Sequence, residues 1–119
     1  MARRRAASDA PVKAEAVYVP IDPPFTVNFR GGAGARYLQV AVEAMTREVD
    51  IEAQIKRHMP VIRNDLTMLF SSKSARDLAT IDGKEALRAE TLASIQKVLQ
   101  AETGKKGIEA VYFTSFVMQ

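Results

Sequence analysis

The amino-acid sequence predicts an α+β fold, in which a mainly antiparallel sheet packs against two to three helices. Three observations lead to this prediction. Two runs of alternating apolar and polar residues flank a glycine-rich segment, and two later stretches have apolar residues at helical spacing. The C-terminal segment 108–118 is again dense in apolar and aromatic residues. The elements are considered below in chain order.

A β-hairpin is predicted near the N-terminal end of the domain. Three prolines within residues 17–24 exclude a helix there and force an extended backbone. Apolar and polar residues then alternate over residues 25–30 and over residues 36–47, which predicts two strands. The GGAGA segment at 31–35 joins them as a hairpin loop. The residues expected on the buried face of the longer strand are Leu38, Val40, Val42 and Ala44.

From Glu48 the apolar period becomes helical and continues to Leu69. Pro60 interrupts this stretch, removes one backbone hydrogen bond and clashes with the carbonyl of Lys56. We therefore predict either a kink at Pro60 or two short helices that meet there. The apolar stripe comprises Ile51, Ile55, Met59, Ile62, Leu66 and Leu69.

A second long helix is predicted over residues 82–103, after a connection at 71–80 that includes a short helical turn or strand at 75–78. Asp82 is expected to be its N-cap, with Glu85 three residues later in the capping-box position. Gly104 is expected to end it. Its apolar face comprises Leu87, Thr91, Ile95, Val98 and Leu99.

The final segment predicts a strand that pairs with the long strand of the hairpin. Strict alternation places Phe116 on the same face as Tyr112, and Phe113 on the other face with Val111. Since both faces are largely apolar, we expect an interior strand covered on both sides. Truncation of Phe113 or Phe116 to alanine is then expected to cost about 3–5 kcal/mol.

No constellation for catalysis, cofactor binding or metal binding is found in the sequence. Cysteine is absent and His58 is the only histidine, which excludes a thiolate nucleophile, a histidine pair and a zinc–thiolate site. The RGGAGAR segment at 30–36 lacks the lysine and the following helix of a phosphate-binding loop, so the hairpin reading is preferred. Four carboxylates that could be imagined as acid–base pairs lie among basic residues, which favours ionised, solvated side chains; they are Asp77, Asp82, Glu85 and Glu90.

The net charge of +3 is mostly a property of residues 1–16, which carry +2, whereas the remaining residues carry +1. We expect residues 1–16 to be a flexible linker or a cloning remnant, and residues 17–119 to form the domain. The MARRR start could bind nucleic acid or anionic lipid, with a solvated leader as the alternative.

The domain itself has no basic stripe with exposed aromatics, so no nucleic-acid partner is expected. No apolar run long enough to span a membrane is found.

Several segments, taken together, resemble the periplasmic domain of the FliL family of flagellar basal-body-associated proteins. They are PPFTVNF and RYLQVAVEA in the hairpin, MPVIRNDLTMLFSSKS, DLATIDGKEALRAETLASIQKVL and the C-terminal VYFTSFVMQ. The segments follow the order of the family and cover residues 17–119. The resemblance implies a stomatin/SPFH-like fold and a single-pass inner-membrane protein, whose N-terminal transmembrane helix is absent from this chain.

The resemblance also implies a function without catalysis. Members of the family are expected to form a homo-oligomeric ring around, or lie beside, stator units of the MotA/MotB type, and to support motor torque in swimming and swarming. The alternative is a stomatin-like membrane scaffold that binds other membrane proteins. No catalytic, cofactor-binding or metal-binding residues are implied.

A head-to-tail ring needs two different surfaces on each subunit. The sequence offers one candidate pair, a basic stretch and an acidic stretch, although both could be ordinary solvated faces. The basic stretch comprises Arg63, Lys73, Arg76 and Lys84, and the acidic stretch comprises Glu43, Glu48, Asp50 and Glu52. Arg63 could instead cap or brace the helix that contains Pro60.

Overall fold

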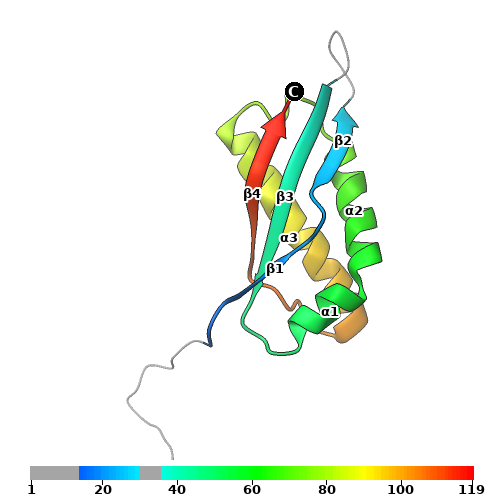
Figure 1. Cartoon of the computed structure of the whole chain (residues 1–119), viewed down its shortest axis with the longest axis vertical. Coiled ribbons are helices and arrows are strands. Elements are labelled where there is room, and N and C mark those ends of the chain that lie inside the picture. Colours follow the sequence, from blue (N-terminus) through cyan, green and yellow to red (C-terminus); the bar gives the residue numbers. More distant parts are fainter. Residues whose placement is uncertain (1–13, 30–35) are drawn as a thin grey trace, which may run out of the picture.

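A computed structural model describes residues 14–29 and 36–119. The chain has four strands and three helices within these residues, and the predicted α+β class is confirmed. Figure 1 shows the helices on one side of the sheet, so that the fold has two layers. The elements are β1 (Val17–Pro20), β2 (Phe25–Phe29), β3 (Arg36–Thr46), α1 (Ile51–Arg57), α2 (Met59–Ser71), α3 (Ile81–Thr103) and β4 (Ala110–Met118).

The long strand β3 is the centre of the sheet, and every other strand pairs with it in antiparallel orientation. The predicted hairpin of β2 and β3 is confirmed, with Phe25 opposite Val40; its loop lies outside the described residues. β1, predicted only as extended backbone, pairs with the other end of β3, with Val17 opposite Thr46. Both β1 and β2 therefore lie on one side of β3, and β4 lies on the other.

The expectation that β4 is an interior strand is wrong. β4 pairs with β3 as predicted, but among the described residues it has no second strand and is an edge of the sheet. Its apolar residues are only partly covered as a result. Val111 is fully buried, Phe113 and Phe116 are half-buried, and Tyr112 is 40% exposed.

A β-bulge in β4 also overturns the predicted assignment of its faces. Val42 lies opposite Phe113 and Ala41 lies opposite Ser115, so Thr114 is an extra residue without a partner. This insertion shifts the alternation by one position. Phe113 and Phe116 consequently pack on the same, helix-facing side, with ring centroids 5.9 Å apart.

The helices form as two short pieces and one long piece. Of the two alternatives at Pro60, separate helices are found, since α1 ends at Arg57, His58 caps both helices and Pro60 lies in the first turn of α2. The predicted cap of α3 is wrong. Thr80, not Asp82, is the N-cap, and its hydroxyl accepts a hydrogen bond from the Gly83 backbone amide at 3.0 Å.

The hydrophobic core lies between the sheet and the helices. The predicted buried face of β3 and the predicted apolar face of α3 both belong to it. Four aromatic rings run through this layer from β2 over α2 to β4, each in contact with the next. They are Phe25, Phe70, Phe113 and Phe116.

Candidate interaction surfaces

The connection before α3 and the carboxylates near it form a local hydrogen-bonded turn. Asp77 accepts a hydrogen bond from the Ser74 amide at 2.9 Å, and the Ser74 hydroxyl accepts one from the Asp77 amide. Hydrogen bonds from the Ser74 amide and from the Ser74 side chain hold the pKa of the Asp77 carboxyl below its usual range. Glu85 pairs with Arg88 at 2.8 Å, and this contact lowers the pKa of its carboxyl as well. Both groups are therefore ionised at neutral pH, in keeping with the surface role predicted for them.

The other candidate groups are also explained by ordinary structural contacts. Glu90 pairs with Lys73 at 2.9 Å, and Asp82 lies exposed in the first turn of α3. His58 is half-buried at the junction of α1 and α2, where its amide donates to the Gln54 carbonyl. The described part of the chain brings no three metal-ligating side chains together.

The two predicted charged stretches do not form continuous surfaces. Arg63 is not part of a basic face, because its guanidinium turns toward the loop before β2 and donates to the carbonyls of Ile21 at 3.1 Å and Pro23 at 2.6 Å. The role considered for this residue, to cap or brace the helix that contains Pro60, is not the one found, because Arg63 braces the loop between β1 and β2. Lys73 is neutralised by Glu90.

The acidic stretch is interrupted in the same way. Glu48 pairs with Lys105 at 3.1 Å, and Glu52 pairs with Lys56 at 3.4 Å. Glu48, together with Asp50, raises the pKa of the Lys105 amine. Complementary charge between these two stretches is therefore a weak basis for assembly.

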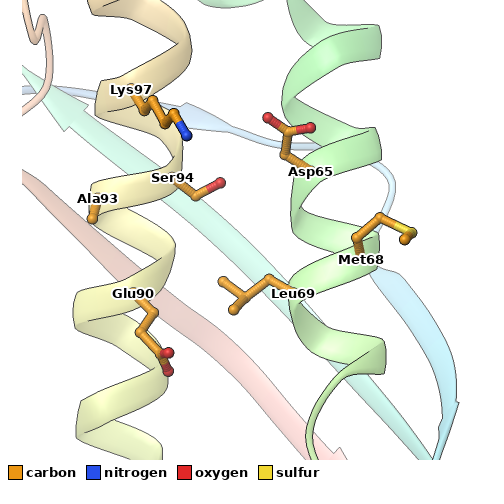
Figure 2. Close-up of a pocket in the computed structure, with 7 residues that line it drawn as sticks. All are labelled: Asp65, Met68, Leu69, Glu90, Ala93, Ser94 and Lys97. Carbon is orange, nitrogen blue, oxygen red and sulfur yellow. The ribbon is translucent and has the colours of Figure 1, made fainter.

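A shallow groove of about 500 Å³ separates α2 from α3 on the outer side of the helical layer (Figure 2). Leu69 points into the groove from α2, while Asp65 and Lys97 project toward each other from opposite helices. Met68 also lines the groove and is 67% exposed. The groove thus has a small apolar floor and charged rims, without the convergent polar groups of a substrate site.

The face of the sheet opposite the helices carries two exposed tyrosines. Tyr18 of β1 and Tyr112 of β4 are 56% and 40% exposed, and their ring centroids are 6.1 Å apart. Val117 is 39% exposed on β4. The sequence pattern does not reveal this surface, because both faces of β4 are largely apolar. The edge position of β4 could not be read from its apolar pattern alone.

Among the described residues, no helix is long and apolar enough to cross a membrane. Five ion pairs join charged side chains among the described residues, and exposed large apolar residues lie on β1, α2 and β4, in the connection before α1 (Val49) and at the start of α3 (Ile81).

Comparison with known proteins agrees with the resemblance seen in the sequence. The family model of the flagellar basal body-associated protein FliL matches residues 18–119, and thus all seven elements of the fold except the first residue of β1. The flagellar protein FliL of Aquifex aeolicus is 30% identical over 99 residues, which are 83% of this chain and 59% of that protein.

The flagellar protein FliL of Escherichia coli K12 is 30% identical over 95 residues, 80% of this chain and 60% of that protein. The protein of the same name from Shigella flexneri gives the same values. The chain thus spans about 60% of the length of these relatives. Because the family model covers nearly the whole described fold, the chain belongs to the family of the flagellar basal body-associated protein FliL.

Proposed function

We propose that this chain is the periplasmic domain of a non-enzymatic accessory protein of the flagellar motor. The observation that carries the proposal is the family match over residues 18–119, which spans the described fold from β1 to β4. In this proposal a membrane helix precedes residue 17 in the full protein and holds the domain at the inner membrane. Residues 1–16 then belong to the linker between the helix and the domain.

The domain acts by assembling with itself and with stator units of the MotA/MotB type. Anchoring in one membrane raises the effective concentration of the domains, so that weak contacts can close a homo-oligomeric ring. The ring or the adjoining protein supports torque when the motor works under load.

Deletion of the gene in its host tests this proposal. We expect normal filament number by electron microscopy, reduced swarming, and lower torque of bead-loaded motors, with recovery when the gene is supplied in trans. Normal torque and swarming in the deletion strain would exclude the motor role. Loss of filaments would instead indicate a role in assembly.

Cross-linking from the periplasm separates the motor role from a general stomatin-like scaffold. In motile cells we expect stator subunits to be captured by the anchored domain, whereas a scaffold of another kind would capture different membrane proteins and leave stators free. The reading frame upstream of residue 1 provides an independent check, since an anchor requires about 20 consecutive apolar residues.

A further inference from the structure

The outer edge of β4 is unusual among the edges of this sheet. The strand AVYFTSFVM runs for nine residues and contains neither proline nor a charged side chain. Native sheets commonly protect an exposed edge with prolines or inward-pointing charges. The opposite side of the sheet follows that rule, since β1 and β2 are short and are separated by Pro20, Pro23 and Pro24.

The backbone groups on this edge can be assigned from the ladder. Gln119 and Tyr37 exchange both backbone hydrogen bonds, at 2.8 and 2.9 Å. In an antiparallel ladder, every second residue directs its backbone amide and carbonyl toward the partner strand. The amides and carbonyls of Met118 and Phe116 therefore point away from β3. No described side chain bonds to them. On the other side of the bulge, the Val111 carbonyl accepts a hydrogen bond from the Arg88 guanidinium at 3.2 Å. The part of the edge without such a contact therefore runs from Phe113 to Met118.

The side chains along the open part of the edge are incompletely covered. Phe113, Phe116 and Met118 pack against the core but remain half-buried. On β2, by contrast, Phe25, Val27 and Phe29 are at most 8% exposed. A fifth strand beside β4 would cover the apolar surface that the chain itself leaves open.

The charged side chains of α3 beside this edge determine which kind of additional strand can bind there. Lys84 of α3 lies over the Phe116 ring, 5.6 Å from its centroid, and forms no ion pair among the described residues. Arg88 lies one helical turn further along α3 and donates a hydrogen bond to the Val111 carbonyl of β4. Arg88 is paired with Glu85, so Lys84 is a cation at this edge that has no carboxylate partner among the described residues. An incoming strand with a carboxylate would be attracted to the same site.

We infer that the outer edge of β4, from Phe113 to Met118, accepts an extended segment of a partner protein as a fifth strand, with apolar side chains toward α3 and an acidic side chain beside Lys84. The backbone hydrogen bonds of Phe116 and Met118 supply much of the affinity, and Lys84 supplies the preference for an acidic partner. The inference deepens the proposed function and rests on it only in taking the domain to act by binding other proteins.

A peptide titration tests the inference without requiring a stator. The probe is a nine-residue peptide of alternating threonine and valine with a central glutamate, and its matched control has lysine at the centre. With the full 119-residue chain at peptide concentrations up to about 1 mM, we expect amide shifts in nuclear magnetic resonance spectra at Phe116 and Met118. The glutamate peptide should bind about threefold more tightly than the lysine peptide.

Variants of Lys84 and Met118 test whether the charge of α3 and the backbone of β4 determine peptide binding. Lys84→Glu should reverse the preference in favour of the lysine peptide, whereas the matched exchange Lys97→Glu, on the groove side of α3, should leave it unchanged. Met118→Pro removes an outward amide and should abolish binding; a thermal melt establishes that this variant is folded. Absence of binding by both peptides, or shifts confined to residues away from β4, would overturn the inference while leaving the proposed motor role to its own genetic test.

Discussion

The Arg63 guanidinium lies over the ring of Phe25, with its central carbon 4.1 Å from the ring centroid. The same group donates two hydrogen bonds to backbone carbonyls in the loop between β1 and β2. One side chain of α2 thereby fixes the path of the proline-containing loop and the start of β2. The residue was a candidate for an interaction surface in the sequence, and the structure gives it a bracing role within the domain.

Replacement of Arg63 by alanine is expected to destabilise the domain by about 2–3 kcal/mol, because two charge-assisted hydrogen bonds and a cation–π contact are lost. Arg63→Lys should lose nearly as much, since a single ammonium group lacks the planar fork that reaches both carbonyls. Denaturation in urea, followed by circular dichroism, measures both values.

The matched control for Arg63 is Arg76→Ala, because Arg76 is an exposed arginine in the connection before α3. This exchange should change the unfolding free energy by less than about 0.5 kcal/mol. Equal effects of the two alanine substitutions would show that the contacts of Arg63 with the loop contribute little to stability.

Local patterns predicted the elements well because each pattern reports on one element at a time. The alternation that ends at Ala44 and the helical stripe around Pro60 each reflect a single face turned toward the core. Contacts between segments that are far apart in the sequence produce no such periodic pattern. Arg63 meets Pro23 across 40 positions of the chain, and nothing in either segment alone indicates that they are neighbours.

The N-cap of α3 is a case in which two local signals compete. Thr80 and Asp82 are both good capping residues, and Glu85 is correctly spaced for a capping box with Asp82. The structure resolves the choice, since Glu85 pairs with Arg88 instead. We expect Thr80→Ala to lower the unfolding free energy by about 1 kcal/mol and Asp82→Ala to lower it by less. A larger loss for Asp82→Ala in the same denaturation experiment would restore the original assignment.

The edge position of β4 changes the expected cost of truncating its aromatic residues. Phe70 is fully buried between Phe25 and Phe113, so Phe70→Ala should cost about 3–5 kcal/mol. Phe116 is half-buried, and Phe116→Ala should cost about 1–2 kcal/mol, less than the sequence analysis predicted. Thermal and chemical denaturation of both variants compares them. Equal losses would indicate that β4 is covered on both sides after all.

The loss of folding stability at low pH should depend on Glu85. Its pKa in the folded domain lies below its ordinary value of 4.5, because Arg88 donates hydrogen bonds to the carboxylate and adds a favourable charge. A lowered pKa stabilises the folded state above pH 4.5, and this contribution is lost as the pH falls through the folded-state pKa. The melting temperature of Glu85→Gln should therefore lie below that of the parent at about pH 7 and converge with it near pH 3.

The control for this pH dependence is Glu102→Gln, at an exposed position on α3 without an ion pair among the described residues. It should give a melting temperature close to that of the parent at both pH values. A constant difference between Glu85→Gln and the parent across the range would show that the carboxylate acts through packing rather than through its charge.

Two glycines that follow α3 have similar positive φ angles but different surroundings, so their substitutions separate backbone strain from packing. Gly104 has a φ of 84° with open space where a Cβ would lie, whereas Gly107 has a φ of 80° and its Cβ would lie 2.9 Å from Ile51 Cδ1 and 3.0 Å from Leu99 Cδ1. Gly104→Ala should cost about 1–2 kcal/mol, from the left-handed conformation alone. Gly107→Ala should cost about 1–3 kcal/mol more, because two buried side chains must move. Urea denaturation measures this difference directly, and equal losses for the two variants would mean that the core beside Ile51 accommodates a methyl group freely.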